Sequence, residues 1–175
     1  KDVTFTVNKG DKIAFISKDG LVVSNFFKIL AGEQPATRGE IKWGVTITKS
    51  YVPNDNASYF KNNDLNLVDW LRQYSAEKDE TFIRGFLGRM LFSGEESLKK
   101  CTVLSGGEKV RCMMSKTMLE EANFLILDEP TNHLDLESIT ALNNGLIEYA
   151  GTIVFTSHDH TFTHTIANRI IELTP

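Results

Sequence analysis

The chain has 175 residues, of which 41% are hydrophobic and 24% are charged. This length and composition suit a soluble globular domain with one substantial core. The formal net charge of −4 excludes nucleic-acid binding through overall positive charge, and no apolar run is long enough to cross a membrane. Its two cysteines, Cys101 and Cys112, fit no metal-ligand or disulfide spacing. We therefore expect free thiols in a cytoplasmic protein without direct membrane insertion.

The first part of the chain is predicted to form strands around one helix. Apolar alternation or apolar runs predict strands in four segments: 2–7, 12–17, 40–44 and 45–53. Between the second and third of these, residues 24–30 are predicted to be helical, with Gly32 as the C-terminal stop.

From about Asn54 to Leu104 the strand signals vanish, and the segments LVDWLRQY, ETFIRGFLGRML and EESLKK have helical periodicity. After them, helices and strands alternate. A helix from Ser105 is followed by the strand FLILD, a helix within 136–148, the strand TIVFTS, a short helix and the segment RIIEL. This alternation predicts an α/β fold with a mainly parallel sheet flanked by helices. The whole chain, 1–175, is interpreted as one domain with a helical subdomain of about 55–118 inserted in its α/β core.

The stretch FISKDGLVVSNFFKILAGE has the outline of a strand, a turn and a helix. The phosphate-binding P-loop pattern G-x-x-x-x-G-K-[ST] can be placed on it. The positions that this placement aligns are Ser17, Lys18, Asp19, Gly20, Leu21, Val22, Val23 and Ser24. Serine and valine replace the two glycines, and Val23 replaces the lysine, so the pattern leaves open whether nucleotide binds here.

Asp128 and Glu129 end a buried strand, at the sheet edge where α/β folds bind ligands. Adjacent carboxylates there indicate a magnesium or catalytic role, although they also occur as a simple strand end. His158 follows the next strand and suits contact with a phosphate or a catalytic group. His160 and His164, an i, i+4 pair, are predicted to be surface residues, since no third ligand completes a zinc site.

The segment LSGGEKV, which contains Leu104, begins a helix. Ser105 and Glu108 form an S-x-x-E capping box. Gly106 and Gly107 leave the first helical N–H groups uncovered, and a plain cap would not need two glycines. We therefore interpret this helix start as an anion site for phosphate. The best candidates for a local basic patch are nearby: Lys99, Lys100, Lys109 and Arg111.

In this order, a P-loop-like turn, a helical insertion, LSGGE, LILDEP and SHD resemble the nucleotide-binding domain of ABC ATPases over nearly the whole chain. The phrase LDEPTNHLD is similar to the ABC-F group, soluble two-domain proteins that act on ribosomes. The second ABC domain of the YbiT-like branch is what four segments resemble most: LVDWLRQY, FLGRMLFSGEE, LSGGEKVRCMMSK and LDLESITALNNGL. The resemblance implies ATP and Mg²⁺ as cofactors, and as partners the ribosome and a second ABC domain of the same full-length chain.

Residue by residue, the resemblance implies a degenerate P-loop over Ser17–Ser24, with Ser24 and Asp128 at the metal. It makes Glu129 the catalytic base and His158 the switch histidine. The signature motif becomes Leu104, Ser105, Gly106, Gly107 and Glu108, and the D-loop becomes Asn132, His133, Leu134 and Asp135. Asn54 stands at the Q-loop position in place of glutamine. An adenine-stacking aromatic would lie upstream of residue 1, so the chain is interpreted as a fragment.

These departures predict an asymmetric pair of ATP sites. Losing the lysine contact with phosphate costs roughly 1.5–3 kcal/mol, so the chain's own site should be weak and its isolated ATPase activity low. Lys18 is a possible substitute for that lysine. The intact signature motif would serve the partner's ATP in a head-to-tail sandwich. Two alternatives stay open: the nucleotide-binding subunit of an ABC membrane transporter, and a non-catalytic ABC-like scaffold.

Overall fold

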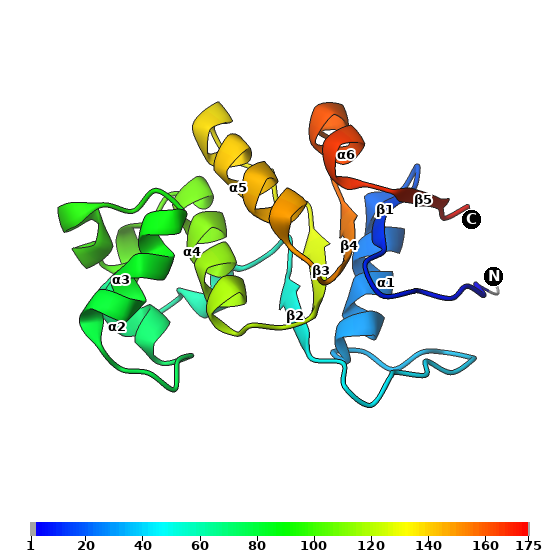
Figure 1. Cartoon of the computed structure of the whole chain (residues 1–175), viewed down its shortest axis with the longest axis horizontal. Coiled ribbons are helices and arrows are strands. Elements are labelled where there is room, and N and C mark those ends of the chain that lie inside the picture. The colour runs from blue at the N-terminus through cyan, green and yellow to red at the C-terminus, as the bar shows by residue number, and fades with distance from the viewer. Residues whose placement is uncertain (1–2, 175) are drawn as a thin grey trace. The chain divides into compact units, whose positions relative to one another are not determined.

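The computed structural model describes residues 3–174 (Figure 1). Its strands are β1 (Lys12–Ile16), β2 (Lys49–Val52), β3 (Phe124–Asp128), β4 (Thr152–Thr156) and β5 (Arg169–Glu172). Its α-helices are α1 (Gly20–Ala31), α2 (Leu67–Arg72), α3 (Glu80–Arg89), α4 (Gly106–Leu119), α5 (Leu136–Glu148) and α6 (His160–Ile166). Short 3₁₀ helices cover Ala57–Tyr59, Gly94–Leu98 and Cys101–Val103.

The chain folds into two compact units. The sheet unit contains the residues up to Asn54, the segment Ala122–Pro130 and the residues from Tyr149 on. The helical unit contains Asp55–Glu121 and Thr131–Glu148.

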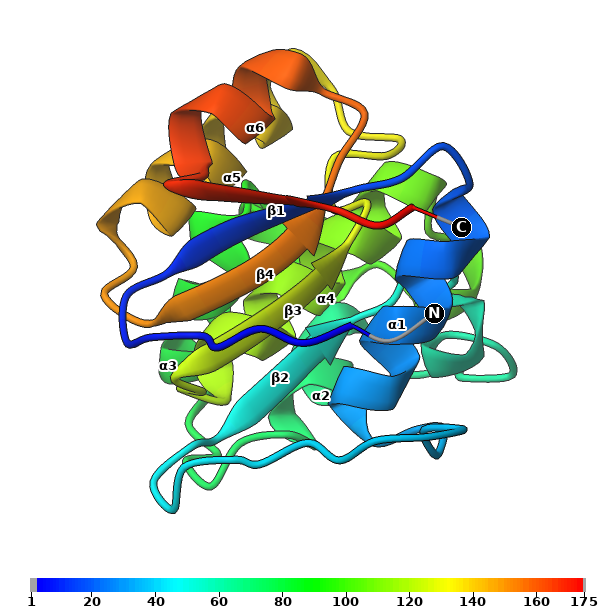
Figure 2. The same cartoon turned by 90° about the vertical axis from the view of Figure 1, so that its right-hand side faces the viewer.

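The sheet unit is built on five parallel strands in the order β2-β3-β4-β1-β5 (Figure 2). Parallel strands need crossover connections, which the alternation of strands and helices supplies. The α/β fold with a parallel, helix-flanked sheet, predicted from that alternation, is confirmed.

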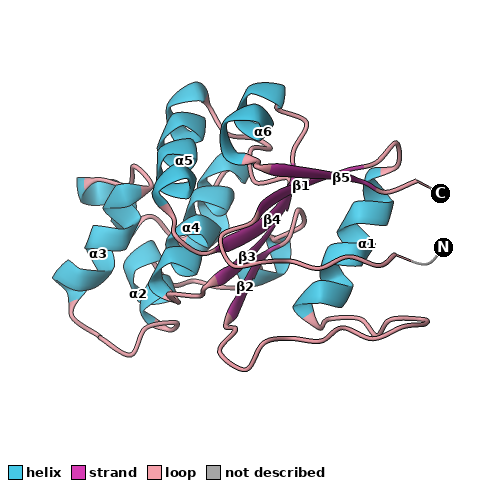
Figure 3. Ribbon diagram, turned by 45° about the vertical axis from the view of Figure 1, so that its right-hand side comes forward, coloured by secondary structure: helices cyan, strands magenta, loops and turns pink. Residues whose placement is uncertain are grey.

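Helices cover both faces of this sheet (Figure 3). On one face α1 packs over the strands and contributes Val23, Phe27 and Leu30 to a buried cluster that includes Val154 of β4. Successive strand residues point to opposite faces, so Phe155 faces the other side. There its ring meets Phe162 of α6 edge-on, with 5.7 Å between centroids. The strand β4 is thus packed on both faces by helices of the sheet unit.

Two predicted strands are not formed. Residues 3–7 have no ladder, because their alternation serves side-chain packing instead: Phe5 lies 5.7 Å from the Phe15 ring, and Val7 also packs on the core. Residue 2 lies outside the described residues. Segment 40–44 is also a loop, in which only Trp43 is partly buried, edge-on against Phe124 at 5.0 Å. In both segments an aromatic anchor accounts for the pattern without backbone pairing.

The helical unit packs α2, α3 and α4 together (Figure 1), and Trp70 of α2 is fully buried. The Trp70 indole N–H donates to the carbonyl of Tyr59 at 3.0 Å, so its polar atom is satisfied. Cys101 and Cys112 are buried here as free thiols, as predicted. In the described part of the chain, 3–174, no helix is both long enough and apolar enough to traverse a bilayer.

Candidate functional site

The turn after β1 is shorter than a phosphate-binding loop. Only Ser17, Lys18 and Asp19 separate the end of β1 from the start of α1. The Asp19 carboxylate accepts a hydrogen bond from the N–H of Leu21 at 3.0 Å, which makes Asp19 the N-cap of α1. The helix therefore begins four residues before the predicted start at Ser24, and residues 20–23 form its first turn.

The side chains at the altered positions face the core. Val23 is 1% exposed and belongs to the buried cluster under α1, and Val22 is partly buried against the same cluster. Position 23, where the P-loop pattern requires lysine, thus points away from solvent. The side chain of Lys18, by contrast, is exposed.

Ser24, Asn54 and Asp128 come together at the carboxyl end of β3. Burial raises the pKa of Asp128, whereas hydrogen bonds from the Ser24 hydroxyl and the Asn54 backbone, and the charge of Lys28, act in the opposite direction. Asp128 is 2% exposed, and its Oδ1 atom has no hydrogen-bond partner. A buried carboxylate oxygen without a partner is costly, and such an atom usually serves a ligand.

Mg²⁺ is the ion that the resemblance implies, and the donor set fits it. A carboxylate oxygen and a hydroxyl are hard ligands of the type that Mg²⁺ prefers. The unpartnered Oδ1 of Asp128, beside the Ser24 hydroxyl, is available for such an ion.

Glu129 and His158 form a second pair at the same edge of the sheet. The Glu129 carboxylate accepts the backbone N–H of His158 at 3.1 Å, and its Oε1 lies 3.4 Å from His158 Nε2. Burial raises the pKa of Glu129, while the charge of His158 lowers it. The Glu129 side chain is 10% exposed and that of His158 86% exposed.

The backbone at Glu129 is also unusual. Its φ of 52° lies in the left-handed region, where a residue other than glycine is strained. Such strain persists where the surrounding structure holds it, and here the N–H of Glu129 donates to Thr156 at 3.1 Å. His160 and His164, in contrast, are exposed on α6, as predicted.

The predicted capping box at the start of α4 is present in the helical unit. The N–H of Glu108 donates to Ser105 Oγ at 3.2 Å, and the N–H of Ser105 donates to the Glu108 carboxylate at 2.9 Å. Burial alone would raise the pKa of Glu108, but hydrogen bonds from Lys99 and Ser105 bring it below the ordinary value. Leu104, just before the cap, is buried.

The two glycines have a packing role that the sequence did not reveal. A Cβ on Gly107 would lie 2.5 Å from the carbonyl oxygen of His133, and one on Gly106 would lie 3.2 Å from the His133 side chain. The interpretation that only anion binding requires both glycines is therefore wrong, because the loop 131–134 lies directly against the first turn of α4. His133 itself has φ 65°. The segments predicted as signature motif and D-loop are thus in contact.

The loop leads into α5 through Asp135. Its carboxylate accepts the N–H of Ser138 at 2.8 Å and caps the helix. Hydrogen bonds from the Ser138 backbone and side chain lower the pKa of Asp135. Asn132 and Leu134 lie in the same loop, and the N–H of Leu134 donates to Thr131 at 3.2 Å.

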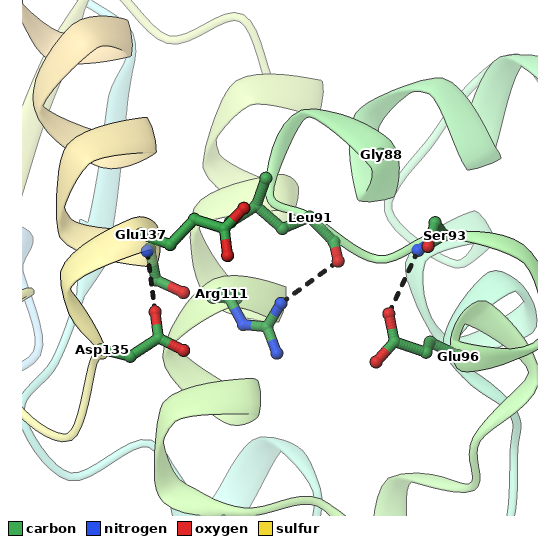
Figure 4. Close-up of a pocket in the computed structure, with 8 residues that line it drawn as sticks. Gly88, Leu91, Ser93, Glu96, Arg111, Asp135 and Glu137 are labelled. Atoms are coloured by element: carbon green, nitrogen blue, oxygen red, sulfur yellow. Dashed lines mark hydrogen bonds between the residues drawn. The ribbon is translucent and has the colours of Figure 1, made fainter.

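Arg111, on α4, lies in a cleft of about 440 Å³ (Figure 4). Its guanidinium donates to the carbonyls of Met90 and Leu91 at 3.2 and 3.3 Å and stacks on Phe92. Lys99 is paired with Glu108 at 2.6 Å. Two of the four residues predicted as a basic patch are thus engaged in internal contacts. Sequence reasoning missed the Arg111 contacts, because nothing in the local pattern marks the carbonyls at the end of α3.

A parallel sheet with paired acids at its carboxyl edge, next to a strand-turn-helix, defines an α/β domain of the P-loop NTPase class. The chain belongs to the ABC transporter family: the family model described as "ABC transporter" matches residues 1–132. It is an ABC-type ATP-binding domain and is homologous to ABC-F proteins.

Three relatives illustrate the similarity. The chain is 66% identical over 175 residues to "Uncharacterized ABC transporter ATP-binding protein YkpA" of Bacillus subtilis (99% of this chain, 32% of the relative). It is 41% identical to "Probable ATP-binding protein YbiT" of Escherichia coli O157:H7 (100% and 33%) and 34% identical to "ABC transporter F family member 5" of Arabidopsis thaliana (99% and 25%). The chain thus spans about a third or less of each relative's length.

Among solved structures, the chain resembles a complex described as "archaeal ribosomal stalk protein aP1 and archaeal ribosome recycling factor aABCE1". The TM-score is 0.81 at 25% identity, over 97% of this chain and 33% of the solved chain.

Proposed function

We propose that this chain is one ABC domain, with a helical subdomain of about 55–118, of a longer cytoplasmic ABC-F protein that hydrolyses ATP and acts on the ribosome in translation. It pairs head-to-tail with a second ABC domain of the same full-length protein. In this pair its own P-loop site is degenerate and weak, and its signature motif serves the ATP held by the partner. The F-family relatives and the ribosome recycling factor among the structural neighbours support the ribosomal role.

The contrast between the two units of the chain carries this proposal. The start of α4 is organised as a capped helix, with Gly106 and Gly107 against His133. The turn after β1 is a short helix cap with Val23 in the core. The first arrangement suits presentation of helix N–H groups to a phosphate, and the second does not.

Glu129 and His158 take the chemical roles in the chain's own site. The buried Glu129 carboxylate is the base that orients a water and accepts its proton, and its raised pKa favours proton acceptance. His158 holds the carboxylate through its backbone N–H, and its exposed imidazole is the group that would contact the terminal phosphate. Ser24 and Asp128 would hold Mg²⁺, which when bound neutralises phosphate charge. Asn54, at the Q-loop position, steadies Asp128.

The test is ATP turnover of the full-length protein with Ser105→Arg. An arginine at the N-cap blocks the helix N–H groups, and we expect turnover to fall about a hundredfold, as when a key anion-binding donor is lost. Thr102→Arg is the matched control, since Thr102 is exposed three residues earlier and gains the same charge. Unchanged turnover in Ser105→Arg would refute the role of the signature motif.

A non-catalytic scaffold is the second candidate, because the short turn after β1 favours it. Glu129→Gln separates the two: loss of turnover in the full-length protein excludes the scaffold. The remaining alternative, a transporter subunit, is tested by sedimentation of the full-length protein. It predicts that the protein sediments with membranes and not with ribosomes.

A further inference from the structure

The N-terminus of α1 already holds an anion of its own. The Asp19 carboxylate accepts the N–H of Leu21 at 3.0 Å, and the backbone carbonyl of Asp19 accepts the N–H of Val22 at 3.1 Å. These first-turn N–H groups are the ones that a phosphate would use at a helix N-terminus. An intramolecular carboxylate holds this position without losing translational freedom, so it competes effectively with a free ligand.

A second observation shows that the region behind this cap is arranged for a ligand. Asp128, at the end of β3, is buried with its Oδ1 unpartnered, and its carboxylate accepts a hydrogen bond from the hydroxyl of Ser24 on α1. Ser24 lies one turn after Gly20, the first residue of the helix. The unpartnered Asp128 carboxylate and the Asp19 cap are therefore both associated with the N-terminal part of α1.

The missing lysine is not the main obstacle to phosphate binding. Val23 is 1% exposed among Phe27, Ile13 and their neighbours, so a lysine there would place its ammonium toward the core. The charge at the mouth of the turn comes instead from Asp19, which is exposed beside Lys18. Phosphate must displace the Asp19 carboxylate or approach within a few ångströms of it, where like charges repel.

We propose that Asp19 is a specificity-determining residue that occupies the phosphate position at the N-terminus of α1 and weakens the binding of nucleotide polyphosphate at this turn. The inference rests on the proposed function in treating this turn as the counterpart of a P-loop. On this proposal an internal carboxylate occupies the turn, and replacing that carboxylate makes the turn accessible to phosphate.

The test is titration of the 175-residue chain with inorganic tripolyphosphate, and separately with Mg-ATP, by calorimetry. Asn is as good an N-cap as Asp, so Asp19→Asn keeps the helix start and removes only the charge. Glycine at the N-cap also costs little, and Asp19→Gly removes the competing acceptor as well. Glu33→Gln is the matched control, an exposed acid just past the other end of α1.

We expect Asp19→Asn to bind tripolyphosphate about tenfold more tightly than the native chain, equivalent to 1.4 kcal/mol. Asp19→Gly should bind at least as tightly as Asp19→Asn, and the amide resonance of Leu21 should shift on titration. Equal affinity of the native chain and both variants overturns the proposal. An equal gain in Glu33→Gln also overturns it, because net charge alone would then explain the effect. ATP turnover of Ser105→Arg tests the role of the signature motif, and phosphate binding by the Asp19 variants tests the role of Asp19. Either proposal can therefore fail without the other.

Discussion

Replacing Gly107 with alanine tests the contact between the start of α4 and the loop 131–134. The new Cβ would lie 2.5 Å from the His133 carbonyl oxygen, closer than real Cβ atoms approach. The neighbour is backbone, so it must shift rather than rotate away. We expect Gly107→Ala to lower the free energy of unfolding by about 2–3 kcal/mol, as overpacking does, after alanine's helix preference offsets part of the cost.

Two glycines of the same unit provide controls. Gly145, inside α5, has nothing within 4 Å of its Cβ position, so Gly145→Ala should stabilise the chain by up to about 1 kcal/mol. Gly106 would meet only the His133 side chain at 3.2 Å, and that side chain is exposed and can rotate, so Gly106→Ala should lie between the two.

Urea unfolding followed by circular dichroism gives the three values on one scale. The reasoning is refuted if Gly107→Ala is as stable as Gly145→Ala. In that case the loop 131–134 would yield without cost, and contact with His133 would not be the reason for Gly107.

Two further predictions concern buried titratable groups. Burial raises the pKa of Tyr149 to about 12, so the folded state favours the neutral phenol; the stability this gives is complete below pH 10 and is lost as the pH rises toward 12. Tyr149→Phe, which lacks the hydrogen bond to the Ala122 carbonyl, should be about 1 kcal/mol less stable at pH 7 and lose less stability between pH 10 and 12; parallel curves would contradict this. Burial also raises the pKa of both thiols, that of Cys101 to about 11, so a disulfide reagent at pH 8 should modify them only as fast as the chain unfolds, and rapid reaction in native buffer would disprove it.

Sequence reasoning succeeded where hydrophobic periodicity and end signals agreed. The runs KIAFI, FLILD and TIVFT form strands because each is a short apolar run, and Ser105 caps its helix as its side chain predicts. The family-specific phrases around Asp128 and Ser105 led to the family, which the match over residues 1–132 shows.

It failed where a local pattern had two physical uses. Segment 2–7 alternates because Phe5 and Val7 pack on the core, and no partner strand pairs with its described residues. The helix after β1 was predicted from Ser24 but begins at Gly20, since a motif is a spacing and does not specify where a helix begins. The packing of Gly107 against His133 joins residues far apart in sequence, and no local signal reports it.

The position of β1 in the sheet has a consequence for synthesis of the chain. β1 is made first, yet its two neighbours are β4 and β5, which begin at Thr152 and Arg169. A nascent chain that ends before Thr152 lacks both neighbours, so Ile13 and Phe15 stay without their sheet partners until translation of this segment is almost finished. The contacts among α2, α3 and α4 are closer in sequence and can form earlier. We therefore expect folding to begin with α2, α3 and α4, while β1 stays without its sheet partners, and prone to aggregation, until β4 has been made.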